Sequence, residues 1–224
     1  MSPAEEFRKG FRDVSPLAVG VAIYGLAFGV LAAQAAMDGL TTGSMGALVF
    51  AGAAQIVAVE RIVAGAGALA AVVAGLALNL RLILVTASIR DLFANRPWWQ
   101  ILLGAHFSTD ENWAVTVATP GAGYWHLVGG GAVLLLAWLT STVAGVIFAS
   151  AIPEPRALGI DFAFTAAFIL IARTLWKGRR DLAPWTTAVA VVAFALWSEA
   201  LDPSWALVIG GIAGAAVAGF AARD

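Results

Sequence analysis

Polar side chains that can bind ions or move protons gather in the stretch HFSTDENWAV, residues 106–115, within a chain that is otherwise strongly apolar. This stretch places two hydroxyls, Ser108 and Thr109, directly before two adjacent carboxylates, Asp110 and Glu111. Carboxylates can hold a cation or a proton, and hydroxyls can satisfy backbone groups that a helix leaves free. Which of these roles they take depends on the solvent that surrounds them.

The composition identifies that solvent. The chain has 224 residues, of which 61% are hydrophobic and 12% charged, and its mean hydropathy is +0.87. Soluble domains are roughly 45–50% apolar and about 25% charged, so a soluble fold could not hide this much apolar surface. We therefore expect a lipid bilayer around the protein. A net charge of −1 argues against nucleic acid as a partner, and the absence of cysteine excludes disulfides and thiolate chemistry.

Eight apolar blocks follow one another, separated by turn-forming residues: 16–37, 44–60, 62–89, 98–118, 124–150, 157–176, 184–200 and 203–222. Hydrocarbon cannot satisfy bare backbone groups, and the blocks lack the alternation of a barrel strand, so they must be helices. The sequence predicts an all-α integral membrane protein, a polytopic bundle of six to eight membrane segments. We expect one transport domain, 1–224, with residues 1–15 as a cytoplasmic N-terminal tail.

Positive residues outside these blocks predict the orientation. They precede the first block, follow the third and follow the sixth: Arg8, Lys9, Arg12, Arg90, Arg96, Lys177, Arg179 and Arg180. Cytoplasmic loops are rich in Lys and Arg, so all three clusters should face the cytoplasm. Eight full crossings would place the loop 91–97 outside. If blocks 44–60 and 98–118 are instead broken and re-enter, every cluster lies inside and six full crossings remain.

Two further polar groups lie deep inside the apolar run GLALNLRLILVTASIR, namely Asn79 and Arg81. An ionisable side chain at membrane depth costs at least about 2.5–3.5 kcal/mol, so it is paired or lines a water-filled cavity. Asp110 and Glu111 are the natural partners of Arg81. The second block adds FAGAAQIVAVER, in which small residues surround Gln55.

The order of these motifs resembles a known family. GAAQ, LNLR and TDE follow one another after YGLAFGVLA (24–32) and before GIDFAFTAAFI (159–169), a pattern similar to the AzlC family of branched-chain amino acid permeases. The resemblance implies export of branched-chain amino acids, and often Met, across the bacterial cytoplasmic membrane together with a small membrane subunit, AzlD. Leu82 follows the LNLR arginine where many relatives have His, which puts in doubt a proton-carrying histidine at that position.

A zwitterionic amino acid needs donors for its carboxylate, acceptors for its ammonium and an apolar slot for its side chain, and transporters often supply these at broken helices. We predict substrate binding by residues of the three polar motifs: Gly52, Gln55, Asn79, Arg81, Thr109 and Glu111. Two alternatives stay open. Instead of binding substrate, Gln55 could equally well form a hydrogen bond between helices. Arg81 could form a permanent ion pair with Asp110 or Glu111 that holds two helices together.

Asp110 is predicted as the coupling carboxylate, which takes up and releases a proton as access alternates between the two sides of the membrane. His106 lies four residues earlier, on the same helix face, so the pair could pass a proton; the alternative is a solvated His106 near the interface. Ser108 and Thr109 should satisfy backbone groups at a helix break. With two distant histidines and no cysteine, we expect no metal and no cofactor.

Two other classes of protein compete with a transporter. An intramembrane hydrolase would need a catalytic dyad, for which Asp110 with Asp161 is the only pair, and neither has the expected glycine motif. A structural subunit would not need buried charges. We therefore expect no enzyme but a proton-coupled secondary transporter for Leu, Ile, Val or Met. GxxxG faces at Gly25–Gly29 and Gly210–Gly214 predict close helix contacts and favour assembly with a small subunit.

Overall fold

The computed structural model describes residues 1–151, 178–199 and 203–221, together with residues 169, 173, 176 and 201. All regular structure in this part of the chain is helical, as the sequence predicts. Three of its helices are long and apolar enough to cross a bilayer, namely α1 (Pro3–Gln34), α4 (Ala68–Ser88) and α7 (Tyr124–Ile147). Residues 3–15, expected as a tail, form the first turns of α1.

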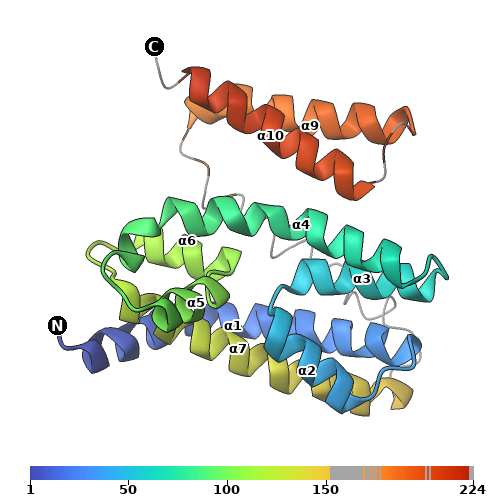
Figure 1. Cartoon of the computed structure of the whole chain (residues 1–224), viewed down its shortest axis with the longest axis horizontal. Coiled ribbons are helices and arrows are strands. Elements are labelled where there is room, and N and C mark those ends of the chain that lie inside the picture. Colours follow the sequence, from blue (N-terminus) through green and yellow to red (C-terminus); the bar gives the residue numbers. More distant parts are fainter. Residues whose placement is uncertain are drawn as a thin grey trace.

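Helices α1 and α7 pack against each other along their length and run parallel to each other (Figure 1). Glycines make their close approach possible, because a Cβ at Gly10 would overlap the backbone of His126 and one at Gly29 the backbone of Gly145. Gly25 in turn lies against Ser141. The predicted glycine face of the first block is therefore confirmed, and it lies against α7.

The second apolar block is broken in the middle. Helix α2 (Gly39–Val49) ends at Phe50, whose φ of 39° lies in the left-handed region, and α3 (Gly52–Val63) begins after Ala51. Gly39 packs near Val143 at the C-terminal end of α7, so α2 runs from that end toward the middle of the bundle. Helix α3 then runs back beside α4 to the short turn 64–67, so the chain enters and leaves at the same end (Figure 1).

The fourth block has the same shape but comes from the opposite end. After η1 (Arg90–Phe93), helix α5 (Trp98–His106) runs inward and α6 (Asp110–Ala118) returns to the start of α7 (Figure 1). Its inner turn packs at Gly131, and Trp113 donates a hydrogen bond to Ser88 at the end of α4. The prediction that blocks 44–60 and 98–118 are broken is confirmed, and each block turns back toward the end from which it came; their re-entry into the membrane stays a prediction.

Helices α9 (Leu182–Trp197) and α10 (Pro203–Ala221) form an antiparallel pair that lies beside α4, with η4 (Arg179–Asp181) preceding α9 (Figure 1). A Cβ at Gly210 or Gly214 would press against α9, which confirms the second glycine face. A short 3₁₀ turn, η2 (Ala149–Ala151), follows α7. Most of block 157–176, with Asp161 and the motif GIDFAFTAAFI, lies outside the described residues.

Candidate substrate cavity

A cavity lies in the middle of the bundle where the two helix breaks meet. Its walls come from α1, the α2–α3 break, α4, the α5–α6 break and α7: Val21, Tyr24, Phe50, Ala51, Gly52, Ala53, Arg81, Leu82, Thr109, Asp110, Glu111, Leu134 and Trp138. The centres of water molecules can occupy about 50 Å³ of it. This is room for a few waters, so the cavity must widen before it can hold an amino acid.

The N-terminal end of α3 faces this cavity without a capping side chain. The residue before it, Ala51, makes no side-chain hydrogen bond to the first turn, and Gly52 and Ala53 line the cavity. Free backbone N–H groups and the positive end of the helix dipole therefore favour an anion there. Glycine is needed at this point, because a Cβ at Gly52 would lie 2.9 Å from Cε1 of Tyr24 and 3.1 Å from Cη2 of Trp138.

The break between α5 and α6 is closed by the hydroxyl pair of the STDEN motif. The Ser108 hydroxyl donates to the carbonyl of Gly104 at 2.7 Å, and the Thr109 hydroxyl accepts from the N–H of Asn112 at 3.4 Å. The first satisfies a carbonyl at the end of α5, and the second caps α6. The prediction that both hydroxyls satisfy backbone groups at a helix break is confirmed.

An ion pair joins the two polar motifs across the cavity. Nη2 of Arg81 on α4 lies 2.8 Å from Oδ2 of Asp110 at the start of α6. The Asp110 side chain is 16% exposed and that of Arg81 43%, so the carboxylate is the more enclosed partner. Glu111 lines the same cavity beside the Thr109 hydroxyl. When ionised, the two carboxylates exceed the single lining guanidinium by one negative charge.

Asn112 is a structural residue of this site whose role the sequence pattern did not reveal. Its side chain is fully buried, and its Nδ2 donates to the carbonyls of Phe107 at 2.7 Å and Leu127 at 2.8 Å. It therefore fastens the α5–α6 break to α7. A Cβ at Gly130 would overlap Asn112 and one at Gly131 would overlap Phe107, so the run GGG in a membrane helix was the available signal.

Five of the eight predicted site residues line the cavity: Gly52, Arg81, Thr109, Asp110 and Glu111. The other three lie outside its lining. Gln55 is fully buried on α3, where its amide atoms have no hydrogen-bond partner among the described residues. Asn79 lines a shallow groove on the outer side of α4 with Thr86 and Arg90. The roles of these residues in binding stay predictions.

His106 lies at the end of α5, half-buried, with its ring 5.6 Å from the ring of Phe50 at the other helix break. It thus contacts the other break without lining the cavity. The helix breaks between His106, the last residue of α5, and Asp110, the first residue of α6, so the two do not share one helix face as the sequence predicted, and the part of His106 in proton transfer stays a prediction. The other histidine, His126, is buried on α7 with Nε2 3.3 Å from Oδ2 of Asp13. Across the described residues, no group of three or more His, Asp or Glu side chains lies close enough to hold a metal ion.

The fold and the cavity are those of a helical membrane protein whose interior holds an ion pair between α4 and the α5–α6 hairpin. Residues 16–152, more than half of the chain, match the family model described as AzlC protein. The chain therefore belongs to the AzlC family, a family of branched-chain amino acid permeases. This confirms the family resemblance seen in the sequence motifs.

Two relatives are both named only "Uncharacterized membrane protein". One from Helicobacter pylori strain J99 is 29% identical over 202 residues, covering 86% of this chain and 88% of its own length. One from strain 26695 is 29% identical over 180 residues, covering 77% of this chain and 78% of its own. No solved structure matches this chain.

Proposed function

We propose that this protein is a proton-coupled secondary transporter that exports Leu, Ile, Val and Met across the bacterial cytoplasmic membrane with a small AzlD-like subunit. The observation that carries the proposal is the central cavity, in which two helix N-termini from re-entrant hairpins meet an ion pair and an apolar wall. Family membership supports the substrate class.

The cavity has opposite polarity on its two hairpin sides, which suits a zwitterion. The uncapped N-terminus of α3, at Gly52, offers backbone donors to the α-carboxylate. Glu111 and Asp110 offer acceptors to the ammonium group. The aliphatic side chain packs against apolar lining residues such as Val21 and Leu134. A lysine or glutamate side chain would place an additional charge on this apolar wall, at a high desolvation cost.

The remaining predicted residues take supporting roles in this proposal. Arg81 holds Asp110 while the site is empty and offers its guanidinium to the substrate carboxylate when the pair opens. Thr109 keeps the start of α6 in place beside Glu111. Gln55 on α3 and Asn79 on α4 lie outside the cavity lining, and we assign them to substrate contacts that form only when the helices move and the cavity widens.

The Arg81–Asp110 ion pair explains how substrate export is coupled to proton movement in this proposal. Protonation of Asp110 removes the charge that binds Arg81, so the cavity can open toward one side only when a proton has arrived. His106 lies at the contact between the two breaks, where it can pass that proton to Asp110. Because the hairpins enter from opposite ends, displacing one of them opens the cavity to one side while the other keeps it closed.

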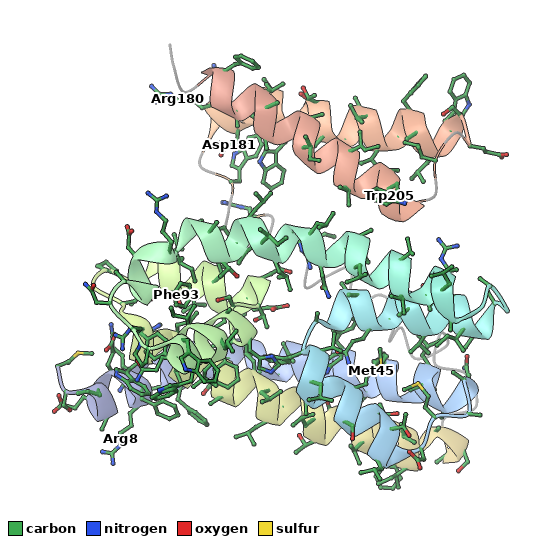
Figure 2. All side chains as sticks on the ribbon, viewed as in Figure 1. Arg8, Met45, Phe93, Arg180, Asp181 and Trp205 are labelled. Carbon is green, nitrogen blue, oxygen red and sulfur yellow. The ribbon has the colours of Figure 1, made fainter. Side chains whose placement is uncertain are left out.

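The distribution of charge supports the orientation. Arg8 near the start of α1 and Arg180 near the start of α9 lie toward the same end of the molecule (Figure 2). Arg96 lies at this end too, with its guanidinium 4.0 Å above the ring of Tyr124. By the positive-inside rule this end, which includes the N-terminus, faces the cytoplasm. Six full crossings agree with this arrangement.

The two rival classes have less support. A scaffold subunit would have no reason to keep Arg81 and Asp110 at membrane depth, where each is costly unless paired. An intramembrane hydrolase would need Asp110 to act with Asp161, which lies outside the described residues. In the described structure Asp110 already pairs with an arginine rather than with a second acid.

Transport assays in proteoliposomes test the proposal. Vesicles with this protein alone, with the subunit alone and with both are loaded with labelled Leu, Val, Lys or Glu, and efflux is measured with and without a proton gradient. We expect gradient-dependent efflux of Leu and Val only when both proteins are present. Equal efflux of Lys or Glu would contradict the substrate class, and full activity without the subunit would contradict the assembly.

A further inference from the structure

One aromatic side chain separates the cavity from the helix packing behind it. Trp138 lies in the middle of α7, is 2% exposed and lines the cavity together with Tyr24 and Leu134. No motif in the sequence marks this residue, because tryptophans in membrane helices more often lie at the ends of the span. Its indole ring occupies volume at the apolar side of the cavity.

Other side chains hold the ring in one position. The ring of Phe28 stacks on it with centroids 5.4 Å apart and planes at 15°, and the ring of Tyr24 lies 5.5 Å away at 49°. Two glycines border its remaining edges. A Cβ at Gly46 would lie 3.2 Å from Nε1, and one at Gly52 3.1 Å from Cη2. The ring therefore cannot turn aside unless the α2–α3 hairpin moves.

The polar atom of this ring has no acceptor among the described residues, which is unusual for a buried tryptophan. By contrast, Nε1 of Trp113 donates to the Ser88 hydroxyl at 2.8 Å. A hydrogen bond therefore does not explain why an indole occupies this position. The shape and volume of the ring at the cavity wall explain its position instead.

We infer that Trp138 sets the upper size limit for the substrate side chain, so that the cavity admits aliphatic side chains and rejects aromatic ones. This inference rests on the proposed function and names the residue that determines its specificity. When displacement of the α5–α6 hairpin widens the cavity, the ring remains as a rigid wall at its apolar side, because Phe28 on α1 and the α2–α3 hairpin still hold it. A smaller side chain at position 138 provides space for a phenyl ring.

The test compares two aromatic-to-leucine substitutions on the same helix. Trp138→Leu enlarges the cavity, whereas Tyr124→Leu removes a buried aromatic ring that does not line it. Each variant, with the subunit if it is required, is assayed for efflux of labelled Val, Leu and Phe from proteoliposomes. We expect the Phe-to-Val ratio to rise at least about tenfold for Trp138→Leu and to stay unchanged for Tyr124→Leu, because pockets discriminate about 10–200-fold per methylene.

A second variant changes the cavity in the opposite direction. Val21→Phe narrows it from the α1 side, so the ratio of Leu to Val efflux should fall. If Trp138→Leu does not reach the membrane, Trp138→Phe replaces it, because a phenyl ring fills less of the cavity than an indole ring and should raise the Phe-to-Val ratio in the same direction. Purified protein supplies a second readout, since a bound amino acid raises the melting temperature, and at equal concentration a tighter-binding one raises it more.

The outcomes separate the two proposals. Wild-type protein that neither transports nor is stabilised by Leu or Val would overturn the proposed function and this inference with it. Wild-type transport of Leu with unchanged ratios in Trp138→Leu and Val21→Phe would overturn the size limit alone. An equal change in Tyr124→Leu would also overturn it, because loosened packing would then explain the effect.

Discussion

The two re-entrant hairpins have the same geometry and opposite chemistry. At the α2–α3 break the chain turns through the left-handed Phe50, and α3 starts without a side-chain cap. At the α5–α6 break the hydroxyls of Ser108 and Thr109 satisfy the backbone, and two carboxylates follow in the first turn. The first break thus offers uncapped backbone N–H groups, which suit the carboxylate of a zwitterion, and the second offers negative charge, which suits its ammonium group.

A long helix follows each hairpin, and these two helices run in opposite directions (Figure 1). The segment 39–88 consists of a hairpin and the full-length helix α4, and the segment 98–147 consists of a hairpin and the full-length helix α7. The two segments enter from opposite ends of the bundle (Figure 1). This is the arrangement of an inverted-topology repeat, in which transporters place their substrate site between the two halves.

The largest effect on transport should come from substitution of Arg81, whose guanidinium pairs with Asp110 at the α5–α6 hairpin. We expect Arg81→Lys to lose at least about tenfold in transport, because an ammonium cannot reproduce the planar fork of the guanidinium on a carboxylate. Efflux from proteoliposomes at equal protein content measures this. Arg90→Lys is the matched control, since Arg90 pairs with Asp91 at the surface and should tolerate the change. Near wild-type transport by Arg81→Lys would mean that charge alone matters.

Asp110→Asn separates binding from coupling at the same hairpin. The amide keeps the shape of the side chain but cannot change its charge, so uphill export driven by a proton gradient should be lost. Downhill exchange of labelled for unlabelled Leu should continue. Counterflow and gradient-driven efflux, measured side by side, distinguish the two. If the variant still concentrates substrate, Asp110 is a structural anchor.

Transport should be sensitive to side-chain volume, rather than to charge, at the α2–α3 hairpin. Gly52→Ala places a Cβ 2.9 Å from Tyr24 and 3.1 Å from Trp138, and it covers the backbone donors of α3. We expect a several-fold rise in the Leu concentration needed for half-maximal transport. Gly20→Ala on α1 is the control, because a Cβ there has open space around it. If the two variants need the same Leu concentration for half-maximal transport, the uncapped N-terminus of α3 is not part of the binding site.

The smallest effect should fall on stability. Asn112→Ala leaves the carbonyls of Phe107 and Leu127 without their donor, which should cost about 1–2 kcal/mol. The melting temperature in detergent should fall accordingly, with transport reduced only as far as the α5–α6 break loosens. Thr140→Ala should change little, since that exposed hydroxyl bonds only to carbonyls of its own helix. An unchanged melting temperature for Asn112→Ala would show that other contacts hold the hairpin.

The sequence by itself determined the class of fold and much of the polar chemistry. Hydrocarbon forces apolar blocks of this length into helices, so an all-helical membrane bundle followed from composition. The positions of positive charge favoured two blocks that return to their starting side, and in the structure both blocks break in the middle and turn back. An arginine inside an apolar run requires a partner, and the Arg81–Asp110 pair at 2.8 Å supplies it.

Tertiary structure alone decided which of the candidate residues meet. Gln55, Asn79 and His106 are polar residues in membrane segments, as Arg81 and Asp110 are, yet the packing of α3, α4 and α5 leaves them outside the cavity lining. Asn112 and Trp138 gained their roles from contacts with residues distant in the chain, to α7 in one case and to Phe28 and Gly52 in the other. Apolar periodicity shows that a face is buried but not which side chain meets it, because many partners satisfy the same pattern.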